Sequence, residues 1–182
     1  IAISEAGSGD LIPAGNIKII ETKDNQGITG IHSEDNGVVI FSGSAIFRMN
    51  TTALSSEFWN VTKVVDNIGS LGQDTSPKTE TAGHNGQLQL PNNSGYVFFN
   101  RAYSDSAQNQ IKIYYWNGNE NNEPQIISDE ITTYLNGFSA FRVYGMCYDH
   151  INNWIWISLK TNVQNILVYD VENKCWYVFT FG

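Results

Sequence analysis

The sequence predicts an all-β chain, a partial β-propeller of about three four-stranded antiparallel blades. Three observations predict this fold. Short apolar runs begin at Val38, Tyr96 and Trp154, and each begins 58 residues after the one before. A segment rich in Asp, Asn, Gly or Ser precedes each run, and two further strand-like segments follow it in the same order. Four consecutive strands, repeated with a period of roughly 50 residues, are typical of propeller blades.

The first two strands of each blade are predicted to form a hairpin. The three segments are ITGIHSEDNGVVIF, GQLQLPNNSGYVFF and YGMCYDHINNWIWI, which span 28–41, 86–99 and 144–157. Each contains an apolar or mixed strand, a turn of small polar residues and four apolar residues, which is the pattern of a β-hairpin. We expect these hairpins to turn at Asp35–Gly37, Asn92–Gly95 and His150–Asn153.

The second strands, VVIF, YVFF and WIWI, have no polar alternation. Continuous apolar runs of this kind indicate burial on both faces, as expected for an inner strand between neighbouring blades. Phe41, Phe99 and Ile157 occupy the same position of the repeat. We therefore expect these three side chains to form one column that is buried between blades.

The third and fourth strands complete each blade. The third strands are AIFRMN, QIKIYYWNG and ILVYDVENK, and the fourth are EFWNVTKVV, EPQIIS and CWYVFTF. Arg48, Lys112 and Asp170 interrupt the third strands. Isolated charges on strands are usually solvated, so we expect these three at the surface. A β-sandwich of many short strands is the alternative fold.

The strand pattern also predicts the domain organisation. It divides the chain into the end of a preceding blade with a linker (1–27), a blade (28–65), a linker (66–85), a blade (86–128), a linker (129–143) and a blade (144–182). Propellers carry about four to eight blades, so three blades make about half of a six-bladed ring. We expect the chain to be a segment of a larger structure, with apolar faces on its end blades that require covering.

Composition argues against several classes of partner. The chain has 182 residues, a net charge of −8 and a pI near 4.7. Because negative charge repels phosphate backbones, specific nucleic-acid binding is not expected. No window reaches the roughly 18 consecutive apolar residues of a membrane span, so no membrane partner is expected.

The cysteines and histidines do not predict a metal site or a disulfide framework. Cys147 and Cys175 lie in apolar strand-like runs, where a free thiol usually packs as a small apolar side chain. His32, His84 and His150 lie far from both cysteines in the sequence, so the spacing of a zinc site is missing. We expect no metal and no cofactor.

The sequence also lacks a recognised catalytic motif. It contains no nucleophile elbow, zinc-protease helix, P-loop or dinucleotide-binding pattern. The glycine-rich AGSGD (6–10) is not followed by a helix start, as a phosphate-binding loop would be. Arg48, Arg101 and Arg142 fall at different strand positions and are not expected to converge on an anion. We therefore predict no catalytic residues and no enzymatic activity.

Two loop features leave a binding role open. The loop Trp116–Pro124 gathers Asn and Glu oxygens but lacks the residue order of a recognised calcium loop, so an ordinary polar loop, a metal site and a glycan contact remain alternatives. Asn50, Asn60 and Asn92 each begin a glycosylation pattern, which matters only in a secreted eukaryotic protein.

Several short motifs resemble a family of phage structural proteins. The order SEAGSGDLIPAGNIKI, GITGIHSEDNGVVIFSGSAIFRMN, NIGSLGQDTSP, GYVFFNRAY and QIISDEI resembles β-propeller proteins of the neck or tail nozzle of tailed bacteriophages, including the packaged-DNA-stabilisation and tail tubular group. The matching residues are Ile28, Thr29, Gly30, Ile31, Phe41, Ile46 and Phe47, and then Ile127, Ser128, Asp129 and Ile131. The resemblance covers most of the chain, and its motifs are structural.

The resemblance implies a virion structural protein that forms part of the neck or tail around the DNA passage. It implies a homo-oligomer that assembles with other virion proteins or with remaining blades of the same protein, and walls whose acidity keeps DNA from adhering. The alternative function is a carbohydrate- or receptor-binding propeller, in which exposed aromatic rings stack on sugars. For that role Trp59 and Trp116, at predicted loop edges, are candidates, whereas Trp154, Trp156 and Trp176 lie on strands and are expected in the core.

Overall fold

A computed structural model describes residue 20 and residues 27–52, 59–70, 86–102, 110–137, 142–160 and 164–181. The chain divides into two compact units, Ile1–Gly69 and Ser70–Gly182, and each is described by itself. The predicted end of a preceding blade (1–27), apart from Ile20 and Gly27, lies outside the described residues, as does 71–85 of the predicted linker 66–85.

The first unit contains one four-stranded antiparallel sheet. Its strands are β1 (Ile28–Glu34), β2 (Gly37–Ser42), β3 (Ala45–Asn50) and β4 (Asn60–Asp66), in the spatial order β1-β2-β3-β4. The turn between β2 and β3 is closed by Ser42, whose hydroxyl donates to the Ala45 carbonyl at 3.0 Å and accepts from the Ala45 amide at 3.1 Å. Ile40, Phe47 and Met49 form a buried cluster on this sheet.

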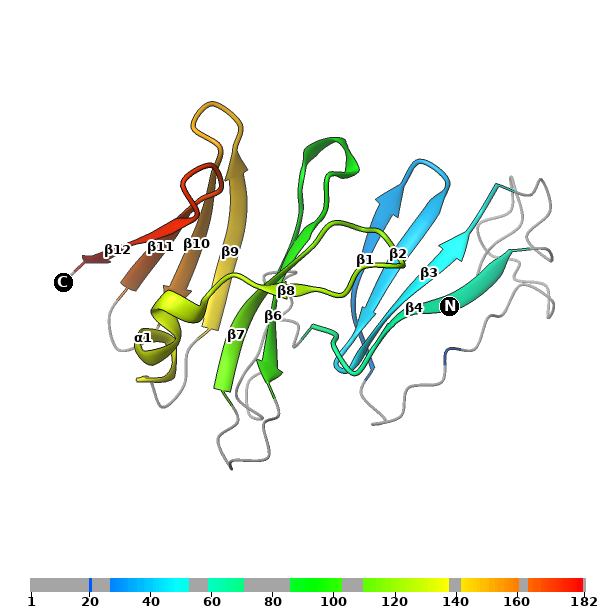
Figure 1. Cartoon of the computed structure of the whole chain (residues 1–182), viewed down its shortest axis with the longest axis horizontal. Helices are drawn as coiled ribbons and strands as arrows, with labels where there is room; N and C mark the ends of the chain where they lie inside the picture. The colour runs from blue at the N-terminus through cyan, green and yellow to red at the C-terminus, as the bar shows by residue number, and fades with distance from the viewer. Residues whose placement is uncertain are drawn as a thin grey trace, which may run out of the picture. The chain divides into compact units, whose positions relative to one another are not determined.

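The second unit contains two further sheets of the same topology (Figure 1). One consists of β5 (Gln87–Gln89), β6 (Tyr96–Ala102), β7 (Gln110–Trp116) and β8 (Gln125–Ile126). The other consists of β9 (Arg142–Asp149), β10 (Trp154–Lys160), β11 (Gln164–Asp170) and β12 (Cys175–Phe181). A 3₁₀ turn, η3 (Pro91–Asn93), joins β5 to β6, and a second one, η4 (Asp129–Ile131), leads into helix α1 (Thr132–Asn136).

These sheets confirm the predicted fold class, an all-β chain with three four-stranded antiparallel blades of a partial propeller. Within each sheet, every strand pairs with the strands next to it in the sequence, and all of the described pairs are antiparallel. The prediction that 38–41, 96–99 and 154–157 occupy equivalent strands is also confirmed, because they lie on β2, β6 and β10, the second strand of each sheet. We call the three sheets the first, second and third blades.

The second and third blades pack face to face on one core. Val97, Phe99 and Ile113 enter it from the second blade, and Ile155 and Ile157 enter it from the third. All five side chains are at most 1% exposed. Such an apolar contact surface is what holds two sheets together, because removing apolar area from water stabilises them by about 25 cal/mol per Å².

The three equivalent residues predicted to form one buried column are buried, as predicted, but they do not form one column. Phe41, Phe99 and Ile157 are 0%, 1% and 0% exposed. Phe99 and Ile157, however, enter the same core from facing sheets. In a ring of blades related by rotation, equivalent residues point in the same direction around the ring. Phe99 and Ile157 would then lie in two different interfaces. The 58-residue spacing therefore identifies equivalent strands but not equivalent faces.

The prediction that every second strand is buried on both faces is wrong for the third blade. Val39, Ile40 and Phe41 of β2, like Val97 and Phe98 of β6, are fully buried. On β10 only alternate residues are buried, and Trp154, Trp156 and Ser158 between them remain partly exposed. The apolar run of β10 thus fills one core and leaves its second face open.

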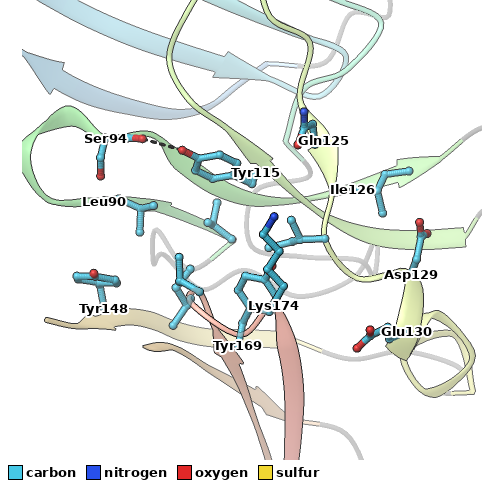
Figure 2. Close-up of a pocket in the computed structure, with 14 residues that line it drawn as sticks. Leu90, Ser94, Tyr115, Gln125, Ile126, Asp129, Glu130, Tyr148, Tyr169 and Lys174 are labelled. Atoms are coloured by element: carbon cyan, nitrogen blue, oxygen red, sulfur yellow. Dashed lines mark hydrogen bonds between the residues drawn. The ribbon is translucent and has the colours of Figure 1, made fainter. Parts of the chain in front are cut away.

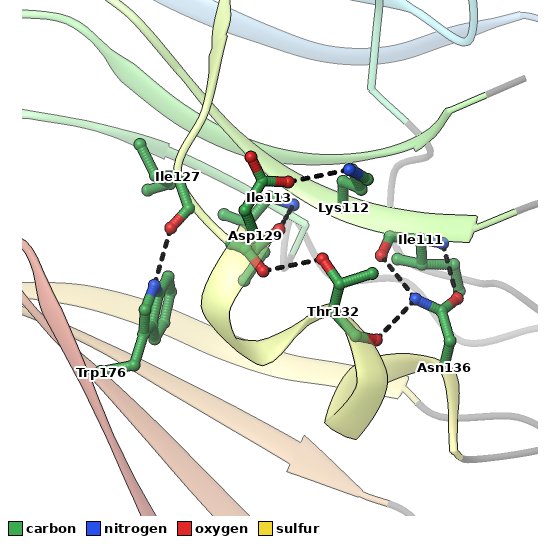
Figure 3. A network of polar contacts seen from close by, with 9 residues as sticks. Ile111, Lys112, Ile113, Ile127, Asp129, Thr132, Asn136 and Trp176 are labelled. Atoms are coloured by element: carbon green, nitrogen blue, oxygen red, sulfur yellow. Dashed lines mark hydrogen bonds and ion pairs between the residues drawn. The ribbon is translucent and has the colours of Figure 1, made fainter. Parts of the chain in front are cut away.

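The connection between the second and third blades, predicted as a plain linker, holds η4 and α1. The side chain of Asn136 acts there like a peptide group at the edge of β7: its oxygen accepts from the Ile111 amide at 2.9 Å, and its amide donates to the Ile111 carbonyl at 3.2 Å (Figure 3). The Ser128 hydroxyl accepts from the Ile113 amide at 2.8 Å. Because β8 has only two residues, these side chains satisfy the part of β7 that a longer fourth strand would cover.

Candidate functional site

The most prominent candidate site is the face of the third blade that points away from the second. Facing residues of antiparallel strands share a face of the sheet, so the register identifies its members. Trp156 pairs with Cys147 on β9 and with Val168 on β11, and Val168 pairs with Tyr177 on β12. We call this surface the open face, and its apolar members are Cys147, Trp154, Trp156, Ile166, Val168, Cys175, Tyr177, Phe179 and Phe181. Val168, at the centre of the sheet, is fully buried.

The open face is an exposed aromatic surface. Tyr177, Phe179 and Phe181 are 44%, 46% and 54% exposed. Trp156 stacks on Phe179 with ring centroids 6.5 Å apart and planes 16° apart, while Trp154 is tilted by 45° against Tyr177 at 6.2 Å. A contiguous apolar patch of this kind usually marks an interaction site, because single proteins seldom leave one uncovered.

The polar groups next to these rings are already engaged. Asp170 is 5% exposed, and its carboxylate accepts from the indole of Trp154 at 3.2 Å. It also accepts from the backbone amides of Glu172 and Asn173 at 3.0 and 2.8 Å. The Cys175 thiol lies 3.5 Å from the hydroxyl of Tyr177, and this hydrogen bond raises the pKa of Tyr177. The Asp170 carboxylate, the Trp154 indole and the Tyr177 hydroxyl are therefore already bonded within the third blade.

Asp170 belongs to a turn that occurs twice in the third blade. In DHINNW (149–154) and DVENKC (170–175), the aspartate accepts from the backbone amides two and three residues later and from the side chain of the following Asn. The fifth residue of each turn, Asn153 or Lys174, has a positive φ of 55° or 54°. These amide donors lower the pKa of Asp149 and of Asp170, because they stabilise the charged carboxylate.

The edge beside the open face is unprotected by charge. β12 lies at the edge of its sheet and has the sequence CWYVFTF, without a charged side chain. By comparison, the edge strand β4 carries Lys63, whose ammonium lies 3.0 Å from Asp66. Side-chain bonds cap β7, as described above. Natural sheets usually protect their edges with charges or covering segments, so β12 combines an exposed edge with an exposed face.

The structure corrects the expectation for the three strand charges. Arg48 forms a two-point ion pair with Glu34, through its Nε at 3.0 Å and its Nη2 at 3.1 Å. Lys112 pairs with Asp129 at 2.8 Å, and its side chain is 16% exposed. Asp170 is buried in its turn, as described above. None of the three is merely solvated, because each interrupts a strand where a specific partner lies within reach.

The tryptophans also differ from expectation. Trp116 ends β7 at the loop edge, as expected, but it is 1% exposed and stacks on Tyr96 at 5.6 Å, so its ring is not open to a sugar. Trp59 is partly buried against the cluster of the first unit. Trp154 and Trp156, expected in the core, lie half-buried on the open face. The residues next to these tryptophans do not decide their exposure, because exposure depends on what packs against each strand face.

The loop Trp116–Pro124 is organised around an indole. The Trp116 Nε1 donates to the carbonyls of Asn119 and Asn122 at 3.0 and 2.9 Å. The side-chain oxygens of Asn117 and Asn119 accept from backbone amides of the same loop. Each of these four oxygens thus already accepts a hydrogen bond from within the loop. Within the described ranges, no group of three or more His, Cys, Asp or Glu side chains is arranged to hold a metal.

The remaining singled-out residues do not converge on a site in the described parts. Cys147 and Cys175 are free thiols, but Cys147 is exposed rather than packed in the core. His32 meets the ring of Phe41 edge-on at 5.6 Å, and His150 lies exposed in a turn. AGSGD (6–10), His84 and the side chains of Arg101 and Arg142 fall outside the described parts of the structure.

The three glycosylation patterns lie at exposed positions. Asn50, Asn60 and Asn92 are all exposed. The Asn50 side-chain oxygen accepts from the amide and hydroxyl of Thr52 at 2.9 and 2.7 Å. No helix in the described ranges has the length and apolar character of a membrane-spanning segment.

Comparisons with known proteins do not assign a family. No family model matches the sequence, and a search of curated proteins finds no match.

Proposed function

We propose that this chain is a structural module that assembles with other protein through the open face of the third blade. The observation that carries the proposal is the exposure of Tyr177, Phe179 and Phe181 beside Trp154 and Trp156, whose counterparts in the second blade, Tyr96 and Phe98, are buried. Covering this face removes aromatic area from water at about 25 cal/mol per Å², which supplies a driving force for association. We also propose that the chain has no enzymatic activity and that it assembles as a homo-oligomer.

More specifically, we propose a virion structural protein of a tailed phage, part of the neck or tail around the DNA passage. This part rests on the resemblance of the hairpin motifs, on the blade topology and on the net charge of −8. A passage for DNA works best with walls that do not bind it, and acidic walls repel the polyanion. The genes beside the full-length gene test this part: portal and capsid genes support it, and genes of carbohydrate metabolism contradict it.

A carbohydrate- or receptor-binding module is the second candidate, and the rings of the open face are what favour it. Trp and Tyr faces stack on sugar rings. Sugar recognition also needs free polar groups beside the rings, whereas Asp170 and the Trp154 indole are bonded to each other. We therefore prefer a protein partner. Binding to a glycan array that is lost with Trp156→Ala would reverse this preference, and hydrolysis of any glycan would overturn the proposal of a non-enzyme.

Sedimentation velocity tests the assembly face directly. The wild-type chain is expected to self-associate as its concentration rises, and Tyr177→Lys with Phe179→Lys is expected to reduce this association. Ile151→Lys is the matched control, because Ile151 is an 80% exposed apolar residue in a turn of the same blade. A wild-type chain that stays monomeric, or equal effects of the control and the double variant, would count against the open face as the assembly surface.

DNA titration tests the proposed acidic wall. We expect weak affinity that changes little with salt, because few phosphate counterions are released when no basic surface meets the backbone. Strong binding that falls steeply between low and high salt would contradict it.

A further inference from the structure

The second unit contains a pocket between the second and third blades (Figure 2). Its volume is about 580 Å³, within the range of roughly 300–1,000 Å³ that is usual for ligand sites. It lies where the turns of the two blades meet, apart from the open face. The second blade contributes Leu90, Val97 and Tyr115, and the third contributes Tyr148, Ile155 and Tyr169.

The base of the pocket is apolar and rigid. Leu90, Val97 and Ile155 are 7%, 0% and 1% exposed and belong to the core between the blades. Two of the tyrosines are fixed by their hydroxyls: Tyr115 donates to the Ser94 carbonyl at 2.9 Å, and Tyr148 donates to the Asn153 side-chain oxygen at 2.6 Å. A pre-formed apolar base suits a large apolar group, because no side chain must be ordered when it enters.

Tyr169 presents a hydroxyl that is still free to bond. Its ring is 8% exposed and lies 4.8 Å from the ring of Trp176. In the part of the chain that the structure describes, its hydroxyl makes no hydrogen bond. Burial is the main cause that raises the pKa of Tyr169, and the charge of Glu130 adds to it. The hydroxyl is therefore protonated at neutral pH and able to donate a hydrogen bond into the pocket.

Two opposite charges also line the pocket. Lys174 comes from the turn between β11 and β12, and Glu130 comes from η4. Neither forms an ion pair with the other or with any other residue of the described ranges. Asp129, which also lines the pocket, is different, because Lys112 already binds it at 2.8 Å. Figure 2 shows the Lys174 side chain extending into the pocket, with Glu130 to one side.

We propose that this pocket binds an extended peptide segment, with a large apolar side chain entering between the blades and with flanking basic and acidic residues that pair with Glu130 and Lys174. A peptide backbone provides a carbonyl acceptor for the Tyr169 hydroxyl. The presence of both signs of charge fits a peptide that carries both, whereas a polyanion would meet the carboxylates of Glu130 and Asp129. This site does not depend on the assembly role of the open face.

Titrations of the isotope-labelled full chain with capped tripeptides, followed by NMR, test the proposal. The probes are acetyl-Lys-Trp-Asp-amide, acetyl-Asp-Trp-Lys-amide, acetyl-Ser-Trp-Ser-amide and acetyl-Lys-Gly-Asp-amide. We expect one order of charges to bind at least about tenfold more tightly than the uncharged and the glycine peptides, because an ion pair and the apolar anchor each contribute. The shifted signals should come from Leu90, Val97, Ile155 and Tyr169.

A charge exchange makes the test specific. Lys174→Glu combined with Glu130→Lys is expected to reverse which of the two charged peptides binds more tightly, while the apolar base is unchanged. Glu172→Lys is the matched control, because Glu172 lies in the same turn as Lys174 but does not line the pocket. If the double variant loses its folded spectrum, Lys174→Gln alone must remove the preference for one order of charges in the peptide. Equal binding of all four peptides, no binding up to millimolar peptide, or an unchanged preference in the exchanged variant would each overturn the proposal.

Discussion

The indole Nε1 of Trp176 donates a 2.7 Å hydrogen bond to the main-chain carbonyl of Ile127, 49 positions earlier in the chain (Figure 3). It links the outermost strand of the third blade to the segment that completes the second blade. The ring of Trp176 packs at the same time on the core between the two blades. A polar and an apolar contact of one side chain thus join the two sheets.

Trp176→Phe should lower the free energy of unfolding by about 1–3 kcal/mol, because it removes the indole hydrogen bond and also part of the apolar ring that packs on the core. Urea denaturation measures the change. Tyr177→Phe is the control on the neighbouring, exposed position of the same strand, and it should change stability by less than about 0.5 kcal/mol. Equal losses for the two variants would mean that the indole bond contributes nothing beyond a surface contact.

Ser128→Ala should lower the free energy of unfolding more than Asn136→Ala, although each variant removes one of the two side chains that hydrogen-bond to the edge of β7. Ser128 is fully buried, so its loss leaves the Ile113 amide without a partner and without water, which costs about 1–3 kcal/mol. The bonds of Asn136 are exposed, so water replaces them and the loss is about 0.5–1.5 kcal/mol. Hydrogen exchange should show faster exchange at Ile113 in the first variant and at Ile111 in the second. The reverse order of stabilities would show that the cap is not what protects this edge.

Asp170 should make stability depend on pH in the acid range. Its pKa is lowered in the folded state by the amides of its turn, so its contribution is present above the ordinary aspartate pKa of 3.8 and is lost as pH falls through the lower folded value. Asp170→Asn should therefore be less stable than the wild type at pH 7, and the difference should shrink below about pH 4. Denaturation curves from pH 7 to pH 2 measure this. A difference that stays constant over that range would exclude the charged carboxylate as the stabilising form.

Phe99→Ala should lower the free energy of unfolding by about 3–5 kcal/mol, because it removes a ring that is 1% exposed from the core between the second and third blades. Phe181→Ala, which truncates a 54% exposed ring, is the control and should cost less than about 1 kcal/mol in the isolated chain. Calorimetry or urea denaturation gives both values. A loss below 1 kcal/mol for Phe99→Ala would place this residue outside a packed core.

The sequence by itself determined the strand order and the hairpins. Apolar runs of four residues, turn residues such as Asp35 and Asn92, and the 58-residue spacing are local signals, and local signals decide which segments become strands and where they reverse. The burial of Phe41, Phe99 and Ile157 followed from the same pattern. Each of these features depends on residues that lie close together in the chain.

Only the tertiary structure decided which surfaces are covered. The apolar runs of β6 and β10 look alike in sequence, yet Phe98 is buried while Trp156 is half-exposed, because burial depends on what packs against the second face. Asn136 caps Ile111 from 25 positions away, and the pocket brings Lys174 toward residues of another blade. Contacts of this kind join distant segments, and no short-range periodicity encodes them; they exist only once the sheets have packed.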